Sequence, residues 1–397
     1  MARTGQRRAF PEGFTWGTAT AAHQIEGGNV NNDWWAFEHA ADSVCTEPSG
    51  DACDSWERWE EDADLVAGLG LDNYRFSIEW SRIEPAEGEF SHAALAHYRR
   101  VCEGLRARGV DPVVTFHHFT TPRWLTDLGG WESGVAVERF ARFCTVVAAA
   151  LGDVMSSACT INEPNIVATM GWHAGLFPPG KNDVGLARRV AGHFVDAHRA
   201  AVEAIRSAAP GIPVGLTLSM TDYQLAPGGE AKLESIRYQA EDVFLDATKG
   251  DDFLGVQTYT RQLIGPEGWT GYEEGVQVLD MGYEFYPAAL GNCLRRAWDY
   301  TDGAVPLFVT ENGIGTTDDD QRIDYVHQTL SGVLDAIDEG IDVRGYTYWS
   351  LLDNFEWALG YRPRFGIVNV DRTTFARSAK PSAGWFAGVA AANALDG

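Results

Sequence analysis

Two glutamates, Glu163 and Glu311, each end a short apolar run that has the composition of a buried strand. Glu163 closes the run ACTINE (158–163), and Glu311 closes the run PLFVTE (306–311). A pair of opposed carboxyl groups is the minimal equipment for cleaving a glycosidic bond, since one protonates the leaving oxygen and the other attacks or stabilises the anomeric carbon. Their surroundings must therefore push the two pKa values apart.

Glu311 is the better candidate for the nucleophile, because two residues from other strand-like runs can serve it. Arg75 can hold its carboxylate ionised, and Tyr259 can donate a hydrogen bond to it. Glu163 instead follows the apolar run ACTI and precedes Pro164, a setting that raises the pKa of a carboxyl group. We predict Glu163 as the acid/base and Glu311 as the nucleophile, with Arg75 and Tyr259 as catalytic partners. Either glutamate taken alone could equally cap a helix or pair with an arginine.

Polar and aromatic side chains gather at the ends of the same runs. Sugar hydroxyls both donate and accept hydrogen bonds, so a sugar pocket needs amide, imidazole and carboxylate groups together. Flat aromatic rings with polar edges suit sugar rings. The candidates for sugar binding are Gln24, His118, Asn162, Trp349, Glu356 and Trp357. Taken singly, each tryptophan could simply fill the core, and His118 could be an ordinary buried histidine.

Eight strand-like runs alternate with helical stretches along the chain. The runs are FTWGTAT (14–20), NYRFSI (73–78), PVVTFH (112–117), ACTINE (158–163), PVGLTLS (213–219), FLGVQTY (253–259), PLFVTE (306–311) and RGYTYWS (344–350). Several lack strict alternation, as strands buried on both faces should. Helical periodicity occupies residues 56–70, 92–109, 136–152, 185–209 and 324–340.

This alternation predicts an α/β fold, a single (β/α)8 TIM barrel with its active site at the C-terminal ends of the strands. An open doubly wound sheet is disfavoured, because no GxGxxG or phosphate-binding loop follows the first strand. We expect one catalytic domain over residues 1–397, with its core at about 10–390. The candidate residues stand where such a barrel requires catalytic groups.

The chain of 397 residues has a formal charge of −25. An acidic surface repels nucleic acid and anionic lipid, so neither is expected as a partner. No apolar run reaches the length of a membrane span. The N-terminal stretch MARTGQRRAF is basic but lacks a following apolar stretch, so we expect no secretion signal and a cytoplasmic protein.

The six cysteines show no spacing typical of a metal site. Cys45 and Cys53 flank the loop TEPSGDA and could pair, although the expected lack of a secretion signal favours free thiols. The two histidines at 117–118 and the acid run DDD at 318–320 form no recognised ligand set, and the acid run is typical of a solvated turn. We expect neither a metal nor a cofactor.

Five stretches, taken together, resemble glycoside hydrolase family 1, the β-glucosidase and β-galactosidase group. They are FTWGTATAAHQIEGG, YRFSIEWSRIEPAEGEF, TINEPN, FVTENGIG and YWSLLDNFEWALGYRPRFGIVNVD, and the resemblance runs from about Phe10 to Phe386. Each motif alone is modest evidence, whereas the set is highly specific. The resemblance implies a (β/α)8 barrel that hydrolyses β-glycosides.

The motifs also imply roles for individual residues. TINEPN implies Glu163 as the acid/base and Asn162 as a ligand of the sugar 2-hydroxyl, and FVTENGIG implies Glu311 as the nucleophile. The last motif implies Trp349 as a platform and Glu356 with Trp357 as binders of hydroxyls at the non-reducing sugar. Phe365, in the same motif, joins the expected binding residues.

Some positions depart from the family pattern. Phe119 stands where a tryptophan is usual and is expected in the binding site, while Gln257 and Thr258 replace the usual Asn-Tyr before Tyr259. Cys159 stands where a tryptophan is common. The segment at about 265–280 is shorter than in the family. These changes concern substrate preference and leave the catalytic pair intact.

The resemblance implies a retaining β-glycosidase that acts on terminal non-reducing β-D-glycosyl residues, with carboxyl groups roughly 5 Å apart. β-Glucosidase activity is expected first, and β-galactosidase or β-fucosidase activity is left open. Glu356 would repel a phosphate, which predicts a neutral sugar. The partners are small-molecule β-glycosides or short oligosaccharides. A transglycosylase that uses the same intermediate and a non-catalytic sugar-binding barrel are the alternatives, and the oligomeric state is left open.

Overall fold

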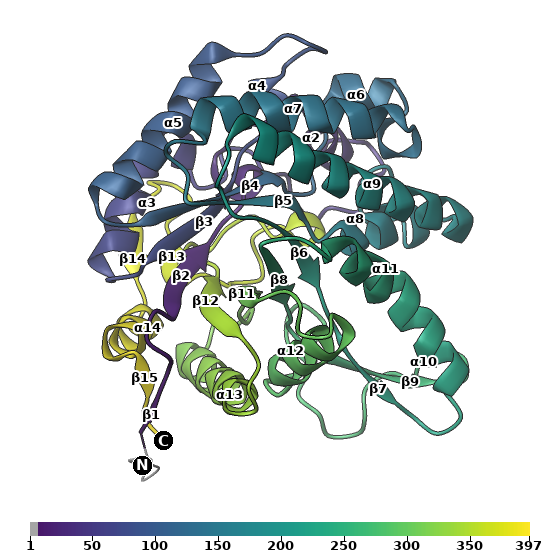
Figure 1. Cartoon of the computed structure of the whole chain (residues 1–397), viewed down its shortest axis with the longest axis vertical. Helices are drawn as coiled ribbons and strands as arrows, with labels where there is room; N and C mark the ends of the chain where they lie inside the picture. Colours follow the sequence, from purple (N-terminus) through teal and green to yellow (C-terminus); the bar gives the residue numbers. More distant parts are fainter. Residues whose placement is uncertain (1–6) are drawn as a thin grey trace.

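The computed structural model describes residues 7–397 and contains a closed barrel of eight parallel strands (Figure 1). In the order in which they pair, they are β11 (Leu307–Asn312), β12 (Val343–Trp349), β2 (Thr15–Ala19), β3 (Asn73–Ser77), β4 (Asp111–His117), β5 (Ser157–Asn162), β6 (Val214–Ser219) and β8 (Phe253–Gln257). Each strand coincides with a strand-like run of the sequence, so the predicted (β/α)8 barrel is confirmed. Residues 1–6, part of the stretch behind the expectation of no secretion signal, lie outside the described residues.

The barrel strands are buried on both faces, which explains their nearly continuous apolar sequences. Every residue of β3 and β8 is buried, polar ones included. Inside the barrel, small residues leave room for polar groups of neighbouring strands. A Cβ added at Gly255 of β8 would lie 2.5 Å from the Thr310 hydroxyl of β11. Glycine at this position therefore admits a buried hydroxyl next to the active-site end of β8.

Helices surround the barrel and bury apolar side chains against it (Figure 1). They are α3 (Ser55–Gly68), α5 (His92–Ala107), α7 (Val135–Leu151), α9 (Val184–Ala208), α12 (Ala289–Tyr300), α13 (Asp319–Asp338) and α14 (Pro381–Ala392). Side-chain caps begin several of them: Ser91 accepts the Ala94 N–H and Asp183 accepts the Leu186 N–H.

The acid run at 318–320 is not the solvated turn that the sequence suggested. Asp318 accepts the backbone N–H groups of Asp320 and Gln321, and α13 begins at Asp319. Carboxylates at a helix N-terminus satisfy unpaired N–H groups and interact favourably with the helix dipole. The prediction was wrong because three adjacent acids are as favourable in a first helical turn as in a loop.

Shorter elements occupy the connections. The helices are α1 (Ala22–Ile25), α2 (Asp33–Glu38), α4 (Trp80–Ile83), α6 (Arg123–Asp127), α8 (Pro164–Ala168), α10 (Glu230–Arg237) and α11 (Val243–Leu245). Outside the barrel, β7 (Asp222–Leu225), β9 (Arg261–Gly265) and β10 (Gly268–Trp269) form a sheet, and β13 (Val368–Val370) pairs with β14 (Arg377–Ala379). Near the ends of the described chain, β1 (Arg8–Ala9) pairs with β15 (Ala394–Leu395), which brings its first and last strands together (Figure 1). Among residues 7–397, no helix combines the length and apolarity that a bilayer crossing requires.

Candidate active site

A cavity of about 450 Å³ opens at the C-terminal ends of the barrel strands. Ten of the twelve residues that we predicted for the site line it: His118, Phe119, Asn162, Glu163, Tyr259, Glu311, Trp349, Glu356, Trp357 and Phe365. The other two, Arg75 and Gln24, are buried and hydrogen-bond to lining residues. The strand order therefore brings residues that are far apart in sequence to one cavity, where a barrel carries its chemistry.

Glu311 lies in β11 and has one partner for each carboxylate oxygen. Arg75 Nη1 donates to Oε1 over 2.6 Å, and the Tyr259 hydroxyl donates to Oε2 over 2.7 Å. Burial raises the pKa of Glu311, and the contacts with Arg75 and Tyr259 oppose that rise. A carboxylate held in this way has charge compensation and a fixed orientation, as a nucleophile requires.

Glu163 follows β5 and caps the short helix α8 in the left-handed region, with φ of 45°. Its backbone N–H donates to Thr217 O in β6, and Pro164 takes the first helical position, where no N–H is needed. Gln257 Nε2 donates to its Oε1 over 2.9 Å. Burial, followed by the charge of Glu311, raises the pKa of Glu163 to about 8. Glu163 is thus poised to hold a proton near neutral pH, as a general acid must.

Asn162 and His118 form the polar floor beside the two glutamates. Asn162 Oδ1 accepts a hydrogen bond of 2.6 Å from Arg75 Nη2, so the guanidinium that pairs with Glu311 also orients this amide. Asn162 Nδ2 lies 3.3 Å from His118 Nε2. Burial and the Arg75 charge lower the pKa of His118 well below its usual value, which keeps the ring neutral. A neutral ring and an oriented amide together supply the donors and acceptors that a sugar needs.

Glu356 and Gln24 lie together beyond the end of β12. Gln24 Nε2 donates to Phe355 O over 2.8 Å and lies 3.4 Å from Glu356 Oε2. Burial, followed by the charges of Glu311 and Glu163, raises the pKa of Glu356 to about 8. The cavity therefore holds three carboxyl groups whose charges repel one another, and neutral polyols fit it better than anions.

Aromatic rings make the cavity walls. His118 stacks nearly parallel to Trp349 and to Trp357, with ring centroids 5.8 Å and 6.1 Å apart. Phe119 packs against Trp357 at 4.9 Å, so it contributes to the wall although it replaces the usual tryptophan. Phe119 and Trp357, like Glu163, have positive φ angles, at 70° and 52°. Non-glycine residues rarely adopt this conformation, and such residues cluster at functional sites.

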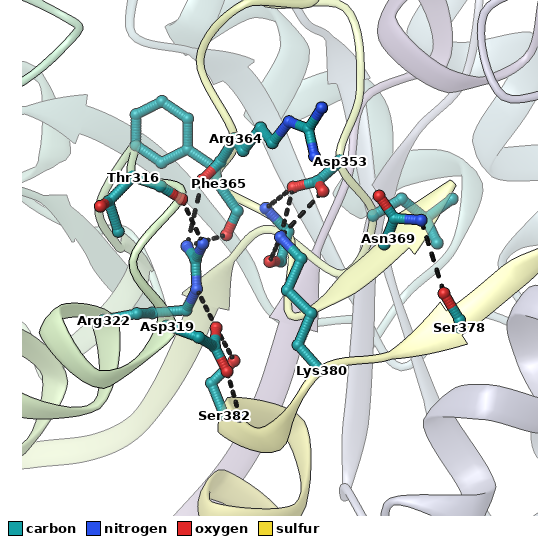
Figure 2. A network of polar contacts seen from close by, with 12 residues as sticks. Thr316, Asp319, Arg322, Asp353, Arg364, Phe365, Asn369, Ser378, Lys380 and Ser382 are labelled. Atoms are coloured by element: carbon teal, nitrogen blue, oxygen red, sulfur yellow. Dashed lines mark hydrogen bonds and ion pairs between the residues drawn. The ribbon is translucent and has the colours of Figure 1, made fainter. Parts of the chain in front are cut away.

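A buried cation holds the loop that carries Phe365 (Figure 2). The Arg322 guanidinium donates to the backbone carbonyls of Arg364 and Phe365 and to Thr316 O, which lies beyond the end of β11. Its Nε donates to Asp319 in the first turn of α13. Arg322 is 1% exposed. One side chain thereby ties the Phe365 loop and the segment that follows β11 to the start of one helix.

Lys380 supports the same wall from the other side (Figure 2). Its Nζ donates to Asp353 Oδ1 over 2.8 Å and to Gly366 O over 2.7 Å. The Gly366 N–H also donates to Asp353 Oδ1. The chain on both sides of Phe365 is therefore anchored by charged groups.

Sequence reasoning did not identify several residues of the site. Gln257 was expected only to alter the pocket wall, yet it contacts Glu163. Ser219, at the end of β6, and Tyr283 line the cavity and were not among the candidates. Ser219 stands at a strand end, which was an available signal, whereas Tyr283 lies in a long connection without a motif. Cys45 and Cys53, whose pairing was left open, are both free thiols.

The closed barrel, the two buried glutamates at its C-terminal end and the aromatic walls define a glycoside hydrolase. The model of glycosyl hydrolase family 1 matches residues 6–251 and 248–395. The chain belongs to this family.

Individual relatives are similar over nearly their whole lengths. Beta-glucosidase A of Thermotoga maritima is 32% identical, with 98% of this chain and 99% of the relative covered. A bifunctional beta-D-glucosidase/beta-D-fucosidase of Bifidobacterium breve is also 32% identical, with 95% and 97% covered. The crystal structure of beta-glycosidase BGL167 has 45% identity and a TM-score of 0.91, with 98% of each chain covered. The protein is thus a glycoside hydrolase of the β-glycosidase group.

Proposed function

We propose that the protein is a retaining β-glucosidase, with Glu311 as the nucleophile and Glu163 as the acid/base. The observation that carries this proposal is the difference between their partners. Glu311 is paired with a guanidinium and a phenol, whereas Glu163 has a neutral amide and a pKa raised to about 8. One carboxyl group is equipped to be ionised and the other to be protonated, as double displacement requires.

In the first step, a Glu311 oxygen bonds to the anomeric carbon while the bond from that carbon to the aglycone oxygen breaks. The Glu163 proton passes to the departing oxygen. In the second step, Glu163 takes a proton from water, the water oxygen bonds to the anomeric carbon, and the bond to Glu311 breaks. Two inversions return the original β configuration.

The substrate is a neutral terminal β-D-glycoside. Glu356 lies where it can hydrogen-bond sugar hydroxyls, and the negative charge of Glu311, which contributes to the raised pKa of Glu356, also disfavours a phosphorylated sugar. Glucose is the first choice because the relatives named above include a beta-glucosidase, and the beta-D-fucosidase activity in the name of one of them extends the choice to fucose. β-Galactosides are a further candidate class of substrate, and turnover of aryl β-glycosides that differ in the sugar tests them.

The aglycone is apolar. Apart from the sugar-binding residues, the cavity lining is dominated by aliphatic and aromatic side chains, among them Val44, Ile166, Met170, Leu176 and Phe177. Val44 and Leu176 are large apolar residues that remain 49% and 44% exposed. Exposed apolar groups at a cavity mark a binding surface, and they offer few hydrogen bonds to a second sugar. We therefore favour aryl and alkyl β-glucosides as substrates over disaccharides.

We place this activity in one catalytic domain with its core at about residues 10–390, in a protein that works in the cytoplasm without metal or cofactor. Hydrolysis is favoured over transglycosylation as the outcome of the second step. Added alcohol should divert the intermediate only at high concentration. A dominant transfer product at low alcohol concentration would overturn this preference.

The test is turnover of an aryl β-D-glucoside, with the anomer of the first product identified by proton NMR. The wild type should release β-glucose first, and Glu311→Ala should lose activity by roughly 10⁵-fold or more. Glu339→Gln, a surface carboxylate paired with Arg295, is the matched control and should keep full activity. First release of α-glucose, or near-normal turnover by Glu311→Ala, would contradict the proposal.

A further inference from the structure

Gln257, the last residue of β8, lies between Glu163 and Thr310 and is completely buried. Its Nε2 donates to Glu163 Oε1 over 2.9 Å, and its Oε1 accepts the Thr310 hydroxyl over 3.0 Å. Because the hydroxyl occupies the amide oxygen, the amide N–H is turned toward the carboxyl group. Gly255 makes this arrangement possible, since a Cβ there would lie 2.5 Å from the Thr310 hydroxyl.

The contact is directed to one glutamate only. Gln257 stands opposite Glu311 in the register between β8 and β11. Both oxygens of Glu311 are already bonded to Arg75 and Tyr259. The Gln257 amide therefore donates to Glu163, which lies between the end of β5 and the start of α8.

We propose, on the basis of the function given above, that Gln257 is a positioning residue for the acid/base. It holds one oxygen of Glu163, directs the other oxygen toward the leaving group, and stabilises the ionised form that acts as the base in the second step. A donor to a carboxylate favours the charged form. Such a donor gives Glu163 access to both protonation states that double displacement uses in turn.

The charges around Glu163 make this assistance useful. Glu311 and burial favour the protonated form, while Arg75, Ser219 and Gln257 favour the ionised form. The Tyr259 phenol and the Glu356 carboxyl face the same cavity. Gln257 is a neutral donor whose hydrogen bond of 2.9 Å to Glu163 favours the ionised form without adding charge to the cavity.

The experiment compares the pH profile of kcat/KM for the wild type, Gln257→Met and Thr310→Val. Methionine has a similar length and donates no hydrogen bond. Loss of the donor raises the pKa of Glu163. The alkaline limb of the profile, where kcat/KM falls as Glu163 loses its proton, should therefore move to higher pH by about one unit. Thr310→Val keeps the Gln257 amide but removes the hydroxyl that fixes its orientation. It should move the alkaline limb in the same direction. Gln224→Met removes a glutamine amide from the outer sheet, where it contacts Asp222 and Tyr286, and should leave the limb in place.

A second readout separates positioning from mere structure. Gln257→Met should lose more activity on an alkyl β-glucoside, which needs protonation to leave, than on 2,4-dinitrophenyl β-glucoside, which does not. The proposal is overturned if the alkaline limb of the pH profile stays in place in a Gln257 or Thr310 variant that folds. It is also overturned if Gln257→Met loses activity equally on both substrates. Failure of the proposed function is distinguishable, because the wild type itself would then turn over neither glucoside.

Discussion

Arg75 and Glu311 form a 2.6 Å ion pair inside the barrel, between strands β3 and β11. The arginine is 1% exposed, so water does not weaken the attraction. Its second nitrogen holds the Asn162 carbonyl. One guanidinium thus fixes the proposed nucleophile and the amide that is expected to contact the sugar 2-hydroxyl, which couples the proposed chemistry to substrate placement.

Arg75→Met should therefore lower kcat on an aryl β-glucoside by roughly 10²–10³-fold. Without the cation, Glu311 is buried beside Glu163 and gains a proton more readily, so less of it can attack. Arg75→Lys should recover part of kcat, since it restores the charge but not the paired contact with Asn162. Arg344→Met removes a surface ion pair with Asp342 and should leave kcat unchanged. Wild-type kcat in Arg75→Met would show that the ion pair has no catalytic role.

The pKa of Glu163 predicts the alkaline limit of activity. Its pKa is raised to about 8, and the first step needs the protonated form, so kcat/KM should fall as pH rises through about 8. Glu356, with a pKa also near 8, must be separated from it. Glu163→Ala, assayed with 2,4-dinitrophenyl β-glucoside, keeps only the Glu356 contribution. An alkaline limb of the same shape in this variant would assign the limb to Glu356.

Because the pKa of Glu163 is raised, its ionisation at high pH lowers the free energy of unfolding. A carboxyl group whose folded pKa lies above its unfolded value of 4.5 stabilises the fold when protonated, and that contribution is lost as pH rises toward about 8. Glu163→Gln carries no such charge, so it should raise the free energy of unfolding by about 1–3 kcal/mol at pH 9. At pH 4 the two proteins should be nearly equal. Urea unfolding at both pH values measures this, and an equal difference at pH 4 and pH 9 would exclude the ionisation as its cause.

The barrel and the gathering of the two glutamates in its cavity were predictable because their signals are local. Strands rich in β-branched residues, each followed by a helical period, identify the fold, and polar residues at strand ends identify the cavity. Glu163 and Glu311 were singled out by their positions at strand ends together with the full set of motifs. Gln257 could not be assigned in this way, since its partners lie 94 and 53 residues away on strands that meet only in the closed barrel.

Arg322 shows a second limit of sequence reasoning. Its acceptors include backbone carbonyls at Thr316 and Phe365, which carry no side-chain signature. The start of α13 was also placed too late, because the acid run that caps it was taken for a turn. Groups that act through backbone atoms of distant loops become visible only in three dimensions.

Arg322→Met should destabilise the protein by about 3–5 kcal/mol, because it leaves several buried carbonyls and Asp319 without their cation (Figure 2). The loop of Phe365 should loosen, so KM should rise more than kcat falls. Urea unfolding and Michaelis–Menten kinetics measure the two effects. Arg344→Met is again the surface control, with a change within about 0.5 kcal/mol. A kcat loss with unchanged KM and stability would mean that Arg322 acts on the chemistry directly.

The apolar cavity mouth gives the last prediction, which concerns the aglycone. Leu176 lines the cavity and is 44% exposed, whereas Leu128, 46% exposed, is absent from its lining. Leu176→Asn should lower kcat/KM for octyl β-glucoside by about fivefold, the effect of losing roughly 1 kcal/mol of apolar contact. It should lower kcat/KM for cellobiose less, or raise it, since asparagine can hydrogen-bond a second sugar. Leu128→Asn should change neither value. An equal loss on both substrates in Leu176→Asn would show that the mouth does not select apolar aglycones, and the preference would then have to come from the walls around Trp349 and Trp357.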